Sequence, residues 1–203
     1  TLFVARNGTC LGWVGLEDTS RPEAVHAVSD LRKAGIGRVI MLTGDKTSVA
    51  EKVAGELGCT DFQAECLPQA KLATVQELRD TGHFVAVVGD GVNDAPALAA
   101  GDIGVAMGAA GSDVAINSAT IALMNNDLRR LPFLIRLSRK TRALVLQNLS
   151  FGLFFMVGGL TLSGFGYMTP ILAAALHNVG SFIVIFNSAR LVRMGEDIAP
   201  HTA

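Results

Sequence analysis

The sequence has little charge and few cysteines. Only 17% of its 203 residues are charged and the formal net charge is −1, so we expect no nucleic-acid partner, which would select a basic surface. Cys10, Cys59 and Cys66 form no Cys-x-x-Cys pair, and we predict that they are reduced packing residues. The chain also has no internal repeat and no low-complexity tract. Hydrophobic residues, by contrast, make up 50% of it.

The hydrophobic excess is concentrated toward the C-terminus. Residues 143–165 contain no ionisable side chain, and residues 169–189 contain only His177. Each run has the roughly 20 apolar residues that a membrane-spanning helix needs, so we predict a helical hairpin with its turn at 166–168. Two buried helices of a soluble core are the alternative. Basic residues on both sides of the hairpin disfavour that alternative and predict that both its ends are cytoplasmic: Arg129, Arg130, Arg136, Arg139, Lys140, Arg142, Arg190 and Arg193.

The first 127 residues have a different pattern. Short apolar segments alternate with helical patterns and glycine turns, which predicts an α/β domain. Strands are expected at 37–42, 83–88, 102–107 and 119–124, and the first two are apolar enough to be covered on both faces.

The most informative segment follows the strand expected at 83–88. Residues 88–98 read Val-Gly-Asp-Gly-Val-Asn-Asp-Ala-Pro-Ala-Leu, which places Asp90 and Asp94 just beyond the strand's carboxyl end. Ligands bind at that edge of open parallel sheets. One or two carboxylates with phosphate and water are what Mg²⁺ usually binds, so we predict a magnesium and phosphate site. A Gly-Asp-Gly string alone is equally typical of a tight turn.

The whole eleven-residue string resembles the hinge motif of the P-type ATPases, ion pumps that phosphorylate themselves on an aspartate. Three further segments resemble family motifs and occur in family order: Asp-Thr-Ser-Arg-Pro at 18–22, Met-Leu-Thr-Gly-Asp at 41–45 and Leu-Pro-Gln-Ala-Lys at 67–71. The resemblance implies a haloacid-dehalogenase-like fold, a doubly wound parallel sheet, followed by an α-helical transmembrane hairpin.

The resemblance also implies roles for individual residues. Thr43, Gly44 and Asp45 would contact phosphate, and their position after a strand supports this because a hydroxyl and free N–H groups bind oxyanions. Lys71 would neutralise the phosphoryl group, whereas a solvated lysine at a helix start is the alternative. Asp90 and Asp94 would bind Mg²⁺, and Asn93 with Asp94 would help to organise the site. Gly89 and Gly91, which flank Asp90 in the turn, would belong to the cofactor-binding site.

One segment is similar in sequence to the family's phosphoacceptor motif. Asp45-Lys46-Thr47-Ser48 resembles Asp-Lys-Thr-Gly-Thr but lacks the glycine, and it begins a helix with Val49, Val53 and Leu57 at helical spacing. We therefore predict that Asp45 caps this helix. In the family the phosphoacceptor lies upstream, and this sequence has no initiating methionine, so we expect the C-terminal part of a longer polypeptide that does not phosphorylate itself alone.

The resemblance divides the chain into segments. In chain order they are the end of a nucleotide-binding region with an entry strand (1–17), the distal phosphorylation domain (18–127), a basic stalk (128–142), a transmembrane helix (143–165), an outside turn (166–168), a second transmembrane helix (169–189) and a cytoplasmic tail (190–203). Coupling between the domain and the hairpin would then pass through residues 129–142.

A chain that ends soon after the second span resembles the heavy-metal (type IB) branch. Histidine at bilayer depth is costly without a function, so His177, with Asn178 and Ser181 on the same helix, is a candidate for binding a transported transition metal. A helix-packing histidine is the alternative. The branch's copper, zinc and cobalt-like pumps carry other residues here, which argues against copper(I) and leaves the metal open.

Together these features predict part of an ATP-driven transition-metal pump in the cell membrane, with a cytoplasmic catalytic domain and a Mg²⁺-dependent aspartyl-phosphate. Its predicted partners are the lipid bilayer, the metal ion and the upstream remainder of the polypeptide. A soluble phosphatase of the same fold should carry its own N-terminal Asp-x-Asp motif and lack the hairpin, and this sequence meets neither expectation. A catalytically inactive, membrane-anchored regulatory fragment without a phosphoacceptor is the alternative that stays open.

Overall fold

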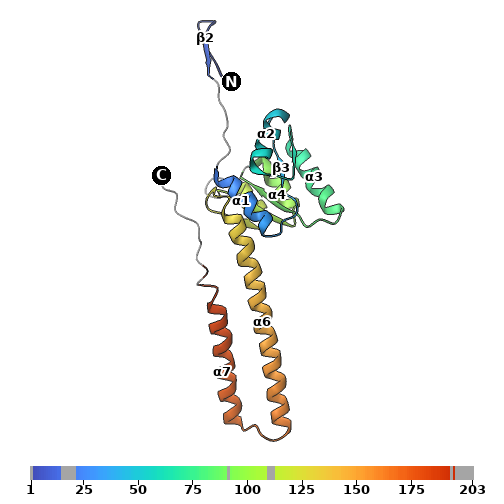
Figure 1. Ribbon diagram of the computed structural model, residues 1–203, viewed down its shortest axis with the longest axis vertical. Coiled ribbons are helices and arrows are strands. Elements are labelled where there is room, and N and C mark those ends of the chain that lie inside the picture. The colour runs from blue at the N-terminus through green and yellow to red at the C-terminus, as the bar shows by residue number, and fades with distance from the viewer. Residues whose placement is uncertain (1, 15–21, 91, 109–112, 193, 195–203) are drawn as a thin grey trace. The chain divides into compact units, whose positions relative to one another are not determined.

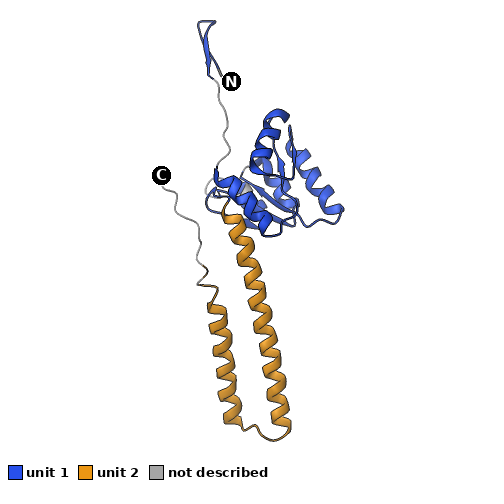
Figure 2. Ribbon diagram, in the orientation of Figure 1, with its two compact units in different colours: residues 1–128 blue, residues 129–203 orange. Residues whose placement is uncertain are grey.

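A computed structural model describes residues 2–14, 22–90, 92–108, 113–192 and 194. The chain forms two compact units, Thr1–Leu128 and Arg129–Ala203 (Figure 2). All the described strands lie in the first unit, and the two longest described helices lie in the second (Figure 1).

The chain begins with a β-hairpin. Strands β1 (Leu2–Arg6) and β2 (Thr9–Val14) pair antiparallel and are joined at Asn7 and Gly8. Both joining residues have positive φ, 48° and 78°, as a tight hairpin turn requires. The large apolar side chains of this hairpin are exposed, Phe3 by 75% and Trp13 by 68%.

The three cysteines are free thiols with different surroundings. Cys66 is buried and Cys59 is partly buried, and burial raises the pKa of the Cys59 thiol. Cys10 is exposed on β2, so the prediction that it is a packing residue is wrong. Its strand is exposed along its whole length, and sequence alone does not show that.

The rest of the first unit alternates helices with parallel strands. In chain order its elements are α1 (Pro22–Lys33), β3 (Ile40–Leu42), α2 (Thr47–Leu57), β4 (Asp61–Gln63), α3 (Pro68–Asp80), β5 (Ala86–Gly89), the 3₁₀ turn η1 (Val92–Asp94), α4 (Ala95–Ala100), β6 (Ile103–Ala106), α5 (Asp113–Ser118) and β7 (Ile121–Ala122). Strands β3 and β4 pair in parallel, and so do β5, β6 and β7 in that order. The α/β class is confirmed, but the described parallel strands form two separate ladders.

The core of this unit lies between α4 and β6. Leu98 is 1% exposed and Ala106 is 0% exposed, and Val87 and Ala119 pack against them. Gly104 permits the close contact, because a Cβ at this position would lie 2.5 Å from the carbonyl oxygen of Leu98. This packing fixes α4 against the sheet and so fixes the end of the turn that joins β5 to α4.

Strand β5 is less buried than its sequence predicts. It begins at Ala86 rather than His83, and Val88 is 42% exposed. Among the described strands β5 pairs only with β6, so no described strand pairs with its other edge. Strand β3 is likewise only partly buried, whereas the next predicted strand, β6, is well buried.

Helix α2 is present as predicted but begins differently. It begins at Thr47, and its N-cap is Lys46 without a side-chain hydrogen bond, so the prediction that Asp45 caps it is wrong. The residues it buries are Ala50 and Ala54, while Val49 is 42% exposed. The small side chains allow close packing of the helix. The helix that the spacing of Val49, Val53 and Leu57 predicts is confirmed, and Val53 and Leu57 are partly buried.

The second unit is a helical hairpin. Helix α6 runs without a break over 35 residues, Arg130–Gly164, and α7 spans 20 residues, Pro170–Ala189 (Figure 1). Pro132 is tolerated in the first turn of α6, where its missing N–H has no intrahelical partner. Both helices are long and apolar enough to cross a membrane, and 6% of the most apolar window of each is buried. A soluble helical core would bury far more of these windows.

Side-chain amides join the two helices of the hairpin. Asn187 Nδ2 donates to Asn148 Oδ1 at 2.8 Å, and Asn148 Nδ2 donates to Ser188 Oγ at 2.9 Å. We call Asn148, Asn187 and Ser188 the amide clamp. Closer to the start of α7, Gly180 is buried and packs against Phe155 of α6. A Cβ at Gly180 would lie 3.2 Å from the phenyl Cε1. Small residues and interhelical amides are typical contacts between membrane helices.

Candidate functional site

The candidate catalytic turn leaves the carboxyl end of β5. Asp90 follows Gly89 and is exposed, and Gly91 lies outside the described residues. The 3₁₀ turn η1 then carries the exposed Asn93 and ends at Asp94, which is the N-cap of α4. A carboxylate at a helix N-terminus interacts favourably with the helix dipole.

Gly89 and Asp94 lie in close contact across this turn. A Cβ built on Gly89 would lie 2.7 Å from the Cβ of Asp94 and 2.9 Å from its Oδ2. These distances are shorter than packed side chains tolerate. The glycine therefore lets the Asp94 carboxylate approach the end of the strand.

Lys71 reaches this turn from α3. Its Nζ lies 2.8 Å from Asp94 Oδ1, and the two side chains are 18% and 19% exposed. Reduced contact with water strengthens such a pair relative to one on the surface. Lys71 is therefore not the solvated helix-start lysine that its sequence also allowed, and the structure places a cation beside the predicted phosphate site.

A second turn follows β3. The Thr43 hydroxyl donates to Asp45 Oδ2 at 2.7 Å, and the Asp45 backbone N–H donates to Thr43 Oγ1 at 3.2 Å. The Thr43 N–H donates to the Gln63 carbonyl, so the prediction that it is free for an oxyanion is wrong. Parallel pairing with β4 uses this N–H. Gly44 and Asp45 are exposed at the tip of the turn.

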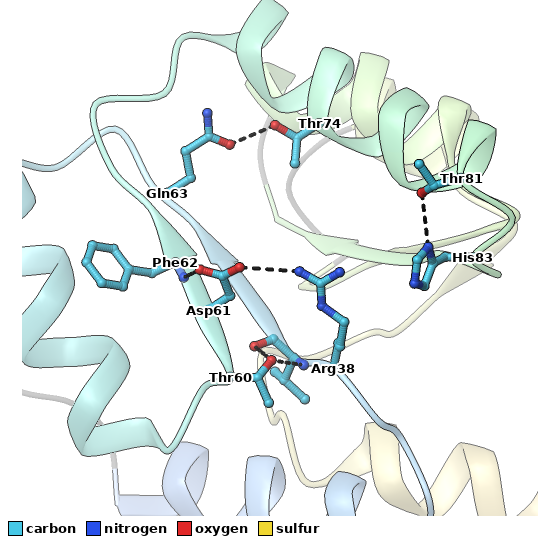
Figure 3. Close-up of polar contacts among 9 residues, drawn as sticks. Arg38, Thr60, Asp61, Phe62, Gln63, Thr74, Thr81 and His83 are labelled. Atoms are coloured by element: carbon cyan, nitrogen blue, oxygen red, sulfur yellow. Dashed lines mark hydrogen bonds and ion pairs between the residues drawn. The ribbon is translucent and has the colours of Figure 1, made fainter.

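The two turns belong to different ladders. In the described part of the chain, no hydrogen bond or ion pair joins Thr43 or Asp45 to the Lys71–Asp94 pair. Helix α3 contacts both ladders, because its Thr74 Oγ1 donates to Gln63 Oε1 of β4 at 2.7 Å (Figure 3). The same helix thus carries Lys71 to the β5 turn and is bound to the strand beside the Thr43 turn.

The residues around β5 fit a magnesium ion. The described residues contain no cluster of three or more His, Cys, Asp or Glu side chains arranged for a metal. Mg²⁺ does not need one, because one or two carboxylates with water and phosphate usually hold it. Asp94 Oδ1 is occupied by Lys71, whereas Asp90 is exposed at the strand end. Asp90 is therefore the better magnesium ligand of the two, and it would supply a hard, negatively charged oxygen.

The candidate metal-transport residues lie on α7. His177, Asn178 and Ser181 are all exposed. Asn178 Nδ2 donates to the Ala174 carbonyl at 3.1 Å, and Ser181 Oγ donates to the His177 carbonyl at 3.0 Å. These bonds stay within the helix, so the described chain does not gather the three side chains into a ligand set. His177 and Ser181, four residues apart, do share one helix face.

Two polar groupings were not predicted. One is the amide clamp of the hairpin, and the other joins Arg79 of α3 to Asp102 at the start of β6, with Nε and Nη2 each 3.1 Å from Oδ1. Helical spacing indicates which residues share a face but not which distant residue they meet. An aspartate at the first position of a predicted strand, and asparagines within apolar runs, were the only signals in the sequence.

Comparisons with known proteins match both the first part of the chain and nearly its whole length. The family model for haloacid dehalogenase-like hydrolases matches residues 4–102, which confirms the predicted fold. A manganese-exporting P-type ATPase of Mycobacterium tuberculosis (strain ATCC 25618 / H37Rv) is 47% identical over 95% of this chain. A zinc-exporting P-type ATPase of Mycobacterium marinum (strain ATCC BAA-535 / M) is 45% identical over 95%, and a cadmium-transporting ATPase of Staphylococcus aureus is 40% identical over 95%.

A solved structure is similar across both units. The crystal structure of a zinc-transporting PIB-type ATPase in its E2.Pi state aligns with 94% of this chain at 39% identity, with a TM-score of 0.80. The chain covers 31% of that protein and 26% or 27% of the curated relatives above. It thus spans about a quarter of the length of these relatives.

Proposed function

The chain belongs to the heavy-metal branch of the P-type ATPases, as its motifs predict, and on that premise we propose that it forms part of an ATP-driven transition-metal pump. Within such a pump, residues 18–127 would belong to the phosphorylation domain and the α6–α7 hairpin to the transport domain. The observation that carries this proposal is the Lys71–Asp94 pair. It holds the partly buried ammonium group of Lys71 2.8 Å from the Asp94 carboxylate, in the turn after β5.

The chemistry assigned to the chain is phosphoryl transfer. The phosphoacceptor aspartate would come from the remainder of the polypeptide and lie beside the edge of β5 with which no described strand pairs, where Val88 is 42% exposed. Its carboxylate attacks the γ-phosphorus of ATP and ADP leaves. Catalysis of this step consists mainly of positioning and electrostatic stabilisation.

Each candidate site residue has a distinct role in that step. Lys71 places positive charge beside the transferred phosphoryl oxygens, and Asp94 fixes the direction of Lys71 through their ion pair. The Thr43 hydroxyl and the Gly44 backbone are proposed to bind the same phosphoryl group, with Asp45 orienting the hydroxyl. Asp90 would hold Mg²⁺, which neutralises phosphate charge when bound, and Asn93 would help to organise the turn.

The hairpin is proposed to carry the transport function. Arginines and a lysine before and after it orient both ends toward the cytoplasm, where ATP is available. His177 is the proposed contact for a transition metal, since imidazole suits zinc, nickel, iron and copper ions. The names of the relatives include manganese, zinc and cadmium, so the cargo has to be identified by experiment.

The test is acid-stable labelling of the complete polypeptide in membranes by γ-labelled ATP. Labelling is repeated with manganese, zinc, cadmium, cobalt, nickel, iron(II) and copper(I). A hydroxylamine-sensitive label that appears with a subset of these ions is the expected result, because an acyl phosphate forms only when the correct cation is bound. If the protein is folded and membrane-inserted but none of these ions produces a label, the result would contradict the pump and favour the inactive regulatory role.

A further inference from the structure

Helix α3 is attached to the sheet at the end opposite Lys71. All three nitrogens of the Arg79 guanidinium are used there: Nε and Nη2 lie 3.1 Å from Asp102 Oδ1, and Nη1 donates to the Ala100 carbonyl at 2.8 Å. A planar guanidinium makes several such bonds in a fixed geometry, which a lysine does not. We call Arg79 and Asp102 the α3 anchor.

Asp102 is itself held by the start of β5. Its Oδ2 accepts from the Val85 N–H at 2.8 Å, and its own N–H donates to the Val85 carbonyl at 2.9 Å. The preceding residue, Gly101, lies so close to β5 that a Cβ would be 2.8 Å from Val87 Cγ2. The Asp102 carboxylate is 20% exposed and is therefore a fixed point rather than a mobile surface group.

The two attachments of α3 lie at opposite ends of one strand. Lys71 contacts Asp94, which follows the carboxyl end of β5, and Arg79 contacts Asp102, which is bonded to Val85 before its amino end. Arg79 lies eight positions after Lys71, which corresponds to about 12 Å along the helix and places the two side chains about 80° apart around its axis. The anchor therefore limits both sliding and rotation of α3 relative to the catalytic turn.

We propose that the Arg79–Asp102 anchor is a positioning pair for the phosphoryl-transfer reaction, because it sets the axial position of α3 and thereby the position of Lys71 Nζ. This inference rests on the proposed function. Neither anchor residue touches the reacting groups. Their effect passes through Lys71, whereas Asp90 leaves β5 directly and is independent of α3.

The proposal is tested in the complete polypeptide by phosphorylation from inorganic phosphate, the reverse reaction. Arg79→Ala should raise the half-saturating phosphate concentration by about threefold or more at saturating Mg²⁺, the lower range for coupled neighbouring sites. At saturating phosphate, its half-saturating Mg²⁺ concentration should stay within about twofold of wild type. General destabilisation of the domain would not separate the two ligands in this way.

Three further variants make the test specific. Asp102→Asn keeps an acceptor for Val85 but loses the charge that holds Arg79, and it should reproduce the phosphate effect. Arg79→Lys keeps the charge without the guanidinium geometry and should restore phosphate affinity only in part. Arg38→Ala is the matched control, because Arg38 forms an exposed pair with Asp61 at 3.3 Å (Figure 3) and should leave both ligands unchanged.

A double-variant cycle provides a second readout. In a Lys71→Ala background, Arg79→Ala should have no further effect on phosphate affinity. An equal effect in both backgrounds would overturn the proposal, and so would equal changes for phosphate and Mg²⁺ in Arg79→Ala alone. If Lys71→Ala abolishes labelling, the proposal is judged by whether Arg79→Ala alone changes the half-saturating phosphate concentration more than the half-saturating Mg²⁺ concentration. A wild-type protein that does not label at all would instead contradict the proposed function.

Discussion

The backbone of Gly89 lies directly against the side chain of Asp94, with space between them for no additional carbon atom. A Cβ on Gly89 would lie 2.7 Å from the Cβ of Asp94. Asp94 in turn pairs with Lys71, so the missing side chain at Gly89 affects the position of the cation two contacts away.

Gly89→Ala should therefore displace Asp94 and weaken phosphorylation. We expect a loss of about 1–3 kcal/mol of stability from overpacking and a clear fall in acid-stable label. Label per folded protein and the thermal midpoint in detergent measure the two effects. Gly55→Ala in α2, where nothing lies within 4 Å, is the control and should stabilise the protein by about 0.5–1 kcal/mol. Unchanged labelling in Gly89→Ala would show that this contact is not needed.

Asp90→Asn should abolish the Mg²⁺-dependent label from ATP, because a neutral amide is a much poorer ligand for Mg²⁺ than a carboxylate. The measurement is label against Mg²⁺ concentration. Asp61→Asn, which alters another exposed carboxylate beyond the catalytic turn, should behave as wild type. Wild-type label in Asp90→Asn would assign the magnesium site to other residues.

The Lys71–Asp94 pair should contribute to stability as well as to catalysis. Lys71→Ala leaves a partly buried carboxylate without its partner, so we expect a loss of about 1–3 kcal/mol in the free energy of unfolding. The double variant Lys71→Ala/Asp94→Ala should lose less than the two single losses added together. Lys33→Ala, from a pair whose side chains are 74% and 46% exposed, should change stability by less than about 0.5 kcal/mol. Strict additivity in a urea titration would argue against a coupled pair.

His177→Ala should weaken stimulation by the transported metal while leaving phosphorylation from inorganic phosphate intact. Loss of one imidazole ligand should raise the half-activating metal concentration by about tenfold or more. Val179→Ala, two residues along α7 and 52% exposed, is the matched control. If the metal dependence of His177→Ala equals that of the control, His177 is a packing residue.

Asn148→Leu should loosen the hairpin. It removes both interhelical bonds of the amide clamp, and at about 0.6 kcal/mol for each such bond we expect a loss near 1 kcal/mol. The unfolding midpoint in detergent micelles measures this. Gln147→Leu alters an exposed neighbouring amide and should have little effect. Equal midpoints for the two variants would mean that the clamp adds no stability.

The sequence predicted the parts of this chain that depend on local pattern. The strands before Thr43 and Asp90 and the two apolar helices occur where periodicity and motif order predict them, although β3 and β5 each begin three residues later than expected. The family followed from four motifs in order, and the comparisons confirm it. The roles of individual site residues and the segment boundaries stay predictions.

What the sequence did not reveal depends on contacts between distant residues. The exposure of Val88 reflects how many strands flank β5, which an apolar run cannot report. The Thr43 N–H is used by Gln63, and Asp102 binds Arg79, across 20 and 23 residues of chain respectively. Periodicity identifies a face of an element but does not identify its partner.

Helix α6 is longer than a helix needs to be to cross a bilayer. Its 35 residues extend about 52 Å, whereas the hydrocarbon of a bilayer is about 30 Å thick. The surplus lies in the basic first part of the same unbroken helix, so in the proposed pump we expect α6 to act as a rigid lever without a hinge at the membrane surface. A tilt of about 10° at one end would displace the other end by about 9 Å.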